Sequence, residues 1–454
     1  MRARALAAAA CAAGLALAGC GGGPSGNLDR SLSYFPATTP AVAVITTDLD
    51  DVQWHTFNGQ IAPLVVHASV RTLLHETAGR TGLSFGDDLK ALLGNPLVIG
   101  LVPGAGPGRP VVAALQVRDA GRLPRVLRAL GFVAAGSADG ARLYRPPLVV
   151  GRRLAPAPRG RPALLAVDRD VLVAAGSARV LRRALAGRRQ GGRLTETLLR
   201  RALPSLPTHP FLRVYGSLRT LAGGVGGNVP WFRALRSYGL AVKLKQRVIE
   251  ARAVVRTASG RVRLDQLPLA GGYAAARIPV REDQVVVGLH DGAPSARFAG
   301  ALLRGTRSPA GALVRALAGQ LAGPAFVALD PDGDVWARAG LRQPGAAART
   351  LRGLASLRAV GGGLYRAGGR LVVGVIGGTL VAAPSARQAR ATAGEPTVVL
   401  AGTHGALTVR ADLATLGPTL ASTFGIQLGS LDEAVGFAIA DRQGLRATIR
   451  VGIR

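Results

Sequence analysis

Histidine is the first residue type to test for chemistry, because it serves both as a metal ligand and as a general base. His75 and Glu76 begin like the helical zinc-binding motif, but the second histidine of that motif is missing. His67 lies eight residues before His75 on a helix expected over about 61–79, so the two cannot chelate one ion without a third ligand between them. The other histidines are scattered, at His55, His209, His290 and His404. We therefore expect no metal site and no cofactor.

Two clusters of aspartates are the candidates for a divalent cation or a paired acid and base. Asp48, Asp50 and Asp51 follow an expected strand, and helix capping is the favoured interpretation, with a divalent site or an acid–base pair as the alternative. The segment 330–334, Asp-Pro-Asp-Gly-Asp, resembles half of a calcium loop but lacks the bidentate glutamate. A tight turn between the strands at 326–329 and 335–337 explains it fully.

Nucleophile and phosphate motifs lack the structural context that their chemistry needs. The Gly-x-Ser-x-Gly pattern occurs at 82–86, but it follows the helix expected over about 61–79 and not the strand that a nucleophile elbow requires. The glycine-rich segment 104–108 lies between two expected strands and is interpreted as a hairpin tip, because a phosphate loop needs a helix after it. We therefore expect no enzymatic activity. An envelope hydrolase remains an alternative, if His55 or His75 meets the Asp48 cluster and a nucleophile in space.

Arginine is the residue type in clearest excess. The chain has 454 residues and a net charge of +32, carried by 54 arginines and 3 lysines. Residues 152–201 hold 13 arginines against three acidic residues. Six of them are the candidates for contact with anionic lipid headgroups or wall polymers: Arg152, Arg153, Arg159, Arg161, Arg188 and Arg189. The alternative is a solvated arginine-rich surface that reflects the codon bias of a GC-rich genome.

The N-terminus has the order of a secretory signal. Arg2 and Arg4 are followed by an apolar stretch over 6–17, which is too short for a good spanning helix. Leu17-Ala18-Gly19-Cys20 then resembles the lipobox of bacterial lipoproteins. In that family, a peptidase cuts before the cysteine and the cysteine sulfur receives a diacylglycerol. The resemblance implies that Cys20 carries lipid and that residues 1–19 are a signal peptide.

Export and lipidation would change the net charge and the cysteine content of the mature chain. Removal of residues 1–19 takes away Arg2, Arg4 and Cys11, which lowers the net charge to +30. With Cys20 lipidated, the mature chain has no free thiol and no disulfide. Nucleic acid is not expected as a partner, because the chain is exported and aromatic residues make up only 4% of it. We expect a protein on the extracytoplasmic face of the cell membrane, held by its lipid and a flexible tether over 20–30.

Several segments recur in the same order, which predicts a degenerate tandem duplication. The clearest pair is 171–179 and 379–387, where seven of nine residues are identical. The interval between matching segments shrinks steadily along the chain, as loop shortening in one copy would produce. We expect the first copy over 31–258, a linker over 259–272 and the second copy over 273–454.

Each copy alternates short strands with helices. In the first copy we expect strands at 41–45, 97–102, 111–117, 143–145, 164–167 and 171–174. Asp119 is the expected N-cap of a helix that Gly131 ends, and Ser177 is expected to start another helix. The second copy repeats this with a helix over 343–354, strands at 371–376 and 380–383, and a helix over 385–393. Tight hairpins favour antiparallel sheets, so the fold class is α+β, two repeats of antiparallel sheet with packed helices.

The lipobox, a short linker and a Phe-Pro-Ala segment at 35–37 leading to Pro-Ala-Val-Ala-Val at 40–44 together resemble a family of high-GC Gram-positive bacteria, the domain of unknown function 3352. The resemblance implies an envelope location and an α+β ectodomain, and it implies no activity or site residues. The favoured function is a non-enzymatic binding or structural module of the cell envelope with an unnamed protein partner. The alternative is a carrier or sensor that holds an apolar ligand in a cleft between the repeats.

Overall fold

The computed structural model describes residues 26–62, 70–102, 110–150, 153–155, 162–202, 209–218, 229–280, 285–303, 309–367, 369, 371–416 and 431–454. The chain forms two compact units. Unit 1 comprises Met1–Leu218 and Ser237–Gln246, and unit 2 comprises Arg219–Arg236 and Arg247–Arg454. The segment expected as a linker, 259–272, lies within unit 2 and contains two short 3-10 helices, Ser259–Arg261 and Leu264–Gln266.

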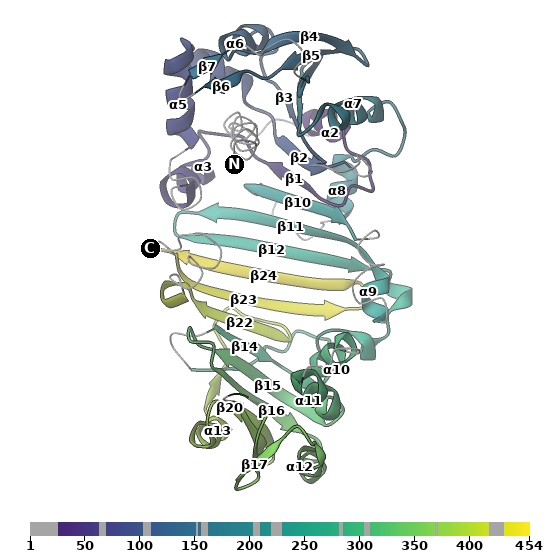
Figure 1. Cartoon of the computed structure of the whole chain (residues 1–454), viewed down its shortest axis with the longest axis vertical. Helices are drawn as coiled ribbons and strands as arrows, with labels where there is room; N and C mark the ends of the chain where they lie inside the picture. The colour runs from purple at the N-terminus through teal and green to yellow at the C-terminus, as the bar shows by residue number, and fades with distance from the viewer. Residues whose placement is uncertain are drawn as a thin grey trace. The chain divides into compact units, whose positions relative to one another are not determined.

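Unit 1 is built on one antiparallel sheet (Figure 1). Its strands follow the spatial order β4, β5, β8, β9, β3, β2, β1, β10, β11. Their bounds are β1 Val42–Ile45, β2 Leu97–Leu101, β3 Val111–Gln116, β4 Val133–Ala138, β5 Ala141–Arg145, β8 Leu165–Asp168, β9 Val171–Ala175, β10 Leu212–Ser217 and β11 Leu235–Lys245. A separate small hairpin, β6 Leu148–Val150 with β7 Arg153–Ala155, lies in the chain between β5 and β8.

Unit 2 repeats this strand order with two strands, β24 and β12, added at one edge. The order is β17, β18, β19, β20, β16, β15, β14, β22, β23, β24, β12, again antiparallel throughout. The bounds are β12 Val248–Thr257, β14 Val285–Leu289, β15 Leu321–Leu329, β16 Val335–Leu341, β17 Arg358–Gly361, β18 Leu364–Arg366, β19 Val372–Ile376, β20 Thr379–Ala383, β22 Leu407–Asp412, β23 Leu431–Asp441 and β24 Gly444–Ile453. A two-stranded pair joins β13 Ile278–Pro279 to β21 Thr397–Val398. Each strand of unit 1 thus has a counterpart in unit 2, which confirms the predicted α+β fold of two degenerate repeats.

Helices follow equivalent strands in the two units. In unit 1 they are α2 Gly26–Leu32, α3 Val52–Thr56, α5 Val70–Thr81, α6 Leu123–Ala129, α7 Ala178–Gly187 and α8 Glu196–Ala202, with π-helical turns at Phe57–Ile61 and Phe85–Lys90. In unit 2 they are α9 Pro230–Ala234, α10 Gly292–Leu302, α11 Pro309–Leu317, α12 Pro344–Gly353 and α13 Ala386–Ala393. α6 and α12 come after β3 and β16, and α7 and α13 come after β9 and β20.

The helix caps test the sequence interpretation at single residues. Ser177 accepts a hydrogen bond from the Val180 amide at the start of α7, and Ser385 accepts one from the Gln388 amide at the start of α13, so both helices begin at the predicted serines. Asp119 is not the N-cap of α6. Its carboxylate instead accepts from the Gly121 amide in the preceding turn, and the helix begins after Arg122, one turn later than expected.

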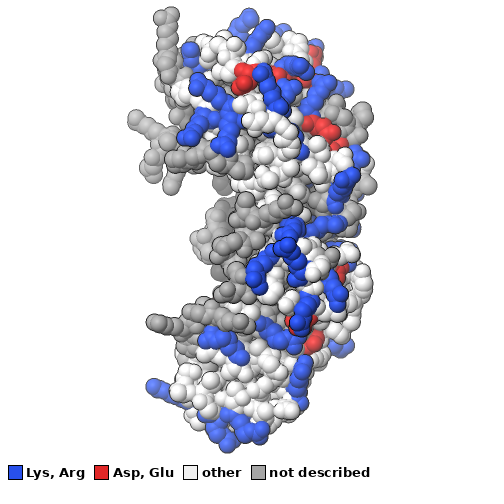
Figure 2. Space-filling view, turned by 90° about the vertical axis from the view of Figure 1, so that its right-hand side faces the viewer, with Lys and Arg blue, Asp and Glu red and all other residues white. Residues whose placement is uncertain are grey.

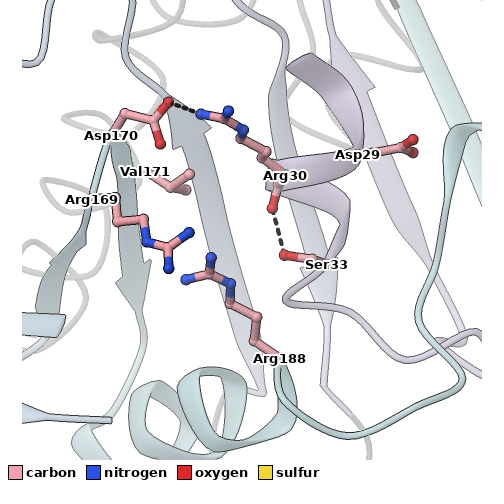
Figure 3. A pocket seen from close by; sticks show the side chains of 7 residues that line it. All are labelled: Asp29, Arg30, Ser33, Arg169, Asp170, Val171 and Arg188. Carbon is pink, nitrogen blue, oxygen red and sulfur yellow. Dashed lines mark hydrogen bonds and ion pairs between the residues drawn. The ribbon is translucent and has the colours of Figure 1, made fainter. Parts of the chain in front are cut away.

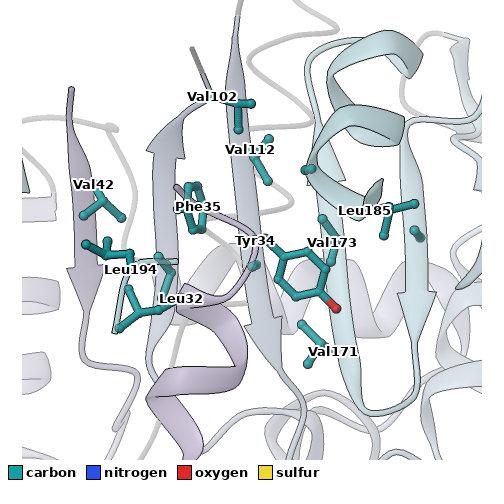
Figure 4. Close-up of a cluster of buried hydrophobic side chains, with 14 of the residues drawn as sticks. Leu32, Tyr34, Phe35, Val42, Val102, Val112, Val171, Val173, Leu185 and Leu194 are labelled. Carbon is teal, nitrogen blue, oxygen red and sulfur yellow. The ribbon is translucent and has the colours of Figure 1, made fainter. Parts of the chain in front are cut away.

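The core of unit 1 lies between the sheet and two helices, α2 and α7. Leu28 and Leu32 of α2, four residues apart on one helix face, are buried in a cluster with strand residues such as Val42 and Val173 and with Leu185 of α7 (Figure 4). Within the tether expected over 20–30, residues 26–30 are therefore part of a packed helix and are not a flexible linker.

Glycine-rich and acidic turns behave as expected where they are described. β2 and β3 pair directly, so the segment 104–108 joins a hairpin, although it lies outside the described residues itself. The 330–334 segment closes a turn in which the Gly333 amide donates to the Asp330 carbonyl and Gly333 has a φ of 82°. Within the described part of the chain, no helix has the length and apolar character needed to cross a membrane.

Candidate functional site

The candidate site is a hollow of about 560 Å³ in unit 1, where three segments distant in sequence meet (Figure 3). Arg30 comes from α2, Arg169 and Asp170 from the turn between β8 and β9, and Arg188 from the C-terminal end of α7. Its remaining lining residues are Asp29, Ser33 and Val171. Three guanidinium groups thus line one small region of the surface.

A buried carboxylate fixes one wall of this hollow. Asp168, the last residue of β8, is only 7% exposed. Its carboxylate accepts a 2.9 Å hydrogen bond from the Tyr34 hydroxyl and forms an ion pair with Arg188. The Arg188 guanidinium also lies 5.6 Å from the centre of the Tyr34 ring. A buried charge is stable only when it is paired and hydrogen-bonded, so these contacts hold the end of α7 against the sheet.

Tyr34 is the neutral member of this group. Its side chain is buried, and burial raises its pKa from 10.0 to about 12, an effect that Asp170 reinforces and that Arg188 and Arg169 oppose. The hydroxyl therefore keeps its proton at physiological pH and donates a hydrogen bond to the Asp168 carboxylate.

A second acidic group fixes the opposite wall. The Asp170 carboxylate accepts a 2.6 Å hydrogen bond from the Gln116 side-chain amide and forms an ion pair with Arg30. The Ser31 hydroxyl, one residue along α2, accepts from the Gln116 backbone amide at 3.1 Å. These contacts attach α2 to β3 and to the β8–β9 turn, so Arg30 is held in place although its side chain is 60% exposed.

Arg169 is the unusual residue of the site. Asp168 pairs with Val171 across the hairpin, which leaves Arg169 and Asp170 as a two-residue turn. Arg169 has a φ of 58°, in the left-handed region that favours glycine. The equivalent turn of unit 2, between Ile376 and Thr379, holds Gly377 and Gly378 at φ of 55° and 81°. Unit 1 thus carries an arginine where the turn conformation prefers glycine.

The charge of this arginine is not compensated. Among the residues that the structure describes, Arg169 has neither a hydrogen bond nor an ion pair, and Figure 3 shows its guanidinium directed toward that of Arg188. The Asp29 carboxylate points away from the arginines and accepts from the Glu196 amide instead. The hollow therefore has a net positive charge, and planar guanidinium groups suit phosphate and carboxylate oxygens.

The structure separates the arginines that the sequence grouped together. Arg152, Arg159 and Arg161 lie outside the described residues, and Arg153 belongs to β7, where no side chain is described. Arg188 lines the hollow and forms an ion pair with Asp168. It is therefore not the free surface cation that we expected from the sequence. Arg189 is exposed beside Gly140 in the β4–β5 turn and does not line the hollow.

The lipobox residues Leu17, Ala18, Gly19 and Cys20 all lie outside the described residues. Lipidation of Cys20 therefore stays a prediction.

The catalytic and metal candidates have structural contacts. Asp51 accepts from the Gln53 amide as the N-cap of α3, which confirms the capping prediction for this residue, whereas Asp48 accepts from the Asp50 amide in the turn before the helix and Asp50 pairs with Lys90. His75 stacks on Phe85 with ring centres 4.0 Å apart. Among the described residues, no group of three or more His, Cys, Asp or Glu side chains is arranged to hold a metal ion.

Arg30 and Arg169 were not selected from the sequence. The signal for Arg169 was present in the repeat comparison, because the Asp-Arg-Asp turn at 168–170 aligns with a Gly-Gly turn in the second copy. Arg30 had no comparable signal, since it meets Asp170 across 140 residues of chain.

Tyr34 makes the stability of unit 1 depend on alkaline pH. The unfolded chain loses the tyrosine proton near pH 10 and the folded chain near pH 12, so the free energy of unfolding should fall as the pH rises across this interval. We expect Tyr34→Phe to reduce that fall, measured by denaturant unfolding at several pH values between 9 and 12. Tyr273→Phe, which changes an exposed tyrosine, should leave the slope unchanged. An equal slope in Tyr34→Phe and the native chain would contradict the assignment.

Comparisons with known proteins add only a distant similarity. No family model matches the chain, and no curated protein matches it. Crystal form III of TP0453 gives a TM-score of 0.28 at 7% identity over 51% of this chain and 82% of that chain. Crystal form IV gives 0.28 at 7% identity over 50% and 81%. A similarity this distant supports no functional argument, and the resemblance to domain of unknown function 3352 stays a prediction.

Proposed function

We propose that the protein is a lipid-anchored module of the cell envelope that has no catalytic activity and binds phosphate-bearing ligands at the Arg30–Arg169–Arg188 hollow. The lipobox at 17–20 supports the anchor. The observation that carries the binding function is Arg169, an uncompensated cation in a conformation that disfavours it.

The geometry of Arg169 separates this hollow from the general basic character of the chain. Figure 2 shows basic side chains widely spread over the visible described surface and few acidic ones. Surface charge alone therefore selects no site. A strained backbone that places an unpaired guanidinium opposite a second one is a more specific feature, because strain persists where a function maintains it.

The first prediction for this function concerns Arg169→Gly. The left-handed turn favours glycine, so the free energy of unfolding of the variant should exceed that of the native chain by up to about 1 kcal/mol. It should also bind inorganic phosphate about tenfold more weakly or worse, because one charge-assisted contact is lost. Chemical denaturation and calorimetric titration with phosphate measure the two effects.

The matched control for this test is Arg182→Gly at an exposed position of α7 that does not line the hollow. It should lose stability by about 1 kcal/mol, since glycine disfavours helix, and keep phosphate binding. Unchanged phosphate binding in Arg169→Gly would exclude the hollow as the anion site.

The anchor is tested separately by Cys20→Ala. The variant lacks the thiol that would receive the diacylglycerol, so the protein should leave the membrane fraction and appear in the soluble fraction. Membrane partitioning that equals that of the native chain would exclude the lipid anchor.

A second candidate function, binding of an acyl chain, rests on one face of the unit 2 sheet. The ladder registers place the following residues on that face: Ile249, Ala251, Ala253, Val255, Leu445, Ala447, Ile449, Val451, Ala434, Gly436, Ala438, Ala440, Leu407, Val409, Ala411, Val285, Val287 and Leu289. None of them has a polar side chain. The ion pairs of these strands, Arg252–Glu250 and Arg410–Glu433, lie on the opposite face.

This face suits an acyl chain better than a protein partner. Protein interfaces carry about one hydrogen bond per 100–200 Å², and these side chains have nothing to donate or accept. Leu269 and Ala270 pack against one end of the face, whereas Ile449 near the middle of β24 is 47% exposed. We expect a fluorescent fatty acid to bind the purified protein and Ile449→Lys to weaken this binding. An equal affinity in both proteins would exclude this face.

A further inference from the structure

We propose that the Arg30–Arg169–Arg188 hollow binds the phosphate of an anionic lipid headgroup in the membrane that holds the anchor, and thereby fixes the orientation of unit 1 on that membrane. The inference rests on the lipid anchor of the proposed function. It names the source of the phosphate, which the hollow alone does not distinguish from a free phosphate or a wall polymer.

The chain between the anchor and the hollow is short. Six peptide steps separate Cys20 from Gly26, the first residue of α2, and they span at most about 21 Å even when fully extended. Arg30 follows four residues later, a helical rise of about 6 Å. Whatever the conformation of residues 20–25, the membrane surface therefore lies within reach of the hollow.

Because α2 is fixed to the sheet of unit 1, the short distance to the anchor also limits the orientation of unit 1 on the membrane. Leu28 and Leu32 are buried in the core of unit 1, and the Ser31 hydroxyl accepts from the Gln116 amide of β3. The helix that begins beside the anchor is thus fixed to the sheet, and its residue Arg30 forms one wall of the hollow. A pull on the anchor acts on the same helix that contributes to the site.

The charges match a headgroup phosphate. Arg30 and Arg188 are each paired once, to Asp170 and Asp168, whereas Arg169 has no partner among the described residues. One phosphate group in the hollow would compensate Arg169 and accept further hydrogen bonds from Arg188. Tethering keeps headgroups at a high effective concentration, so a weak intrinsic affinity is sufficient for occupancy.

The test uses the full-length lipidated protein in vesicles of phosphatidylcholine, with or without phosphatidylglycerol. A fluorophore on Gln190→Cys, an exposed residue two positions after Arg188, reports distance to a quencher attached to the headgroups. We expect strong quenching on phosphatidylglycerol vesicles and at least a threefold loss of quenching on pure phosphatidylcholine. Arg169→Gly should show the same loss on phosphatidylglycerol, and Arg169→Lys should recover part of it. The surface control Arg182→Gly should behave like the native chain.

Two further readouts separate this inference from the proposed function. Flotation of the protein with vesicles in 1 M salt reports the lipid anchor alone, because salt screens the arginines, and failure to float would overturn the anchor. If the protein floats but quenching is the same with and without phosphatidylglycerol, the headgroup inference is wrong. It is also wrong if Arg169→Gly and the native chain are quenched equally on phosphatidylglycerol vesicles. Binding of inorganic phosphate together with phosphatidylglycerol-independent quenching would overturn the lipid assignment and assign the hollow to a soluble anion or a wall polymer.

Discussion

The burial of the Asp168 carboxylate is the constraint on which the candidate site depends. A carboxylate with so little exposure needs a cation and a hydrogen-bond donor beside it, and Arg188 and Tyr34 supply them. Tyr34 follows α2, Asp168 ends β8 and Arg188 ends α7. One charge thus joins three segments that are distant in the sequence, and the position of the neighbouring turn residues 169 and 170 follows from this arrangement.

The two units show how one scaffold accommodates different surfaces. Their strand orders correspond, and the helices after β9 and β20 begin with the same serine cap. The hairpin turn before those strands differs, because unit 1 has Arg169 and Asp170 where unit 2 has Gly377 and Gly378. Backbone geometry common to both units is therefore kept, while the charged side chains that define the hollow belong to unit 1.

Local patterns in the sequence were sufficient for most of the secondary structure. Alternating apolar residues predicted β3 and β9 to within one residue, and the helix starts at Ser177 and Ser385 were predictable because a serine cap depends on residues only three positions away. The prediction failed at Asp119, where a turn over 120–122 precedes the helix, and at residues 26–30, where Gly26 and Asn27 suggested a linker. The spacing of Leu28 and Leu32 indicates a helix only once the apolar partners of these residues are known.

The candidate site was less accessible to sequence reasoning. The basic stretch at 152–201 drew attention to arginines that lie together in the chain, but ion pairing decides which of them remain available. Arg188, from the basic stretch, forms an ion pair with Asp168, and Arg30, which lies outside that stretch on α2, also lines the site. Such long-range pairings depend on the completed fold, so composition identified the charge of the region and not the residues that use it.

The glycines of the unit 2 turn also have an evolutionary meaning. Codons for glycine and arginine differ by a single base, and the turn between β19 and β20 already has the backbone conformation that Arg169 adopts in unit 1. A duplicated chain of this kind can therefore gain or lose a cationic binding position by one point mutation in a turn, without rebuilding a strand or a core. Tandem copies with matching turns provide two independent positions at which such a specificity can arise, and selection needs to maintain it at only one.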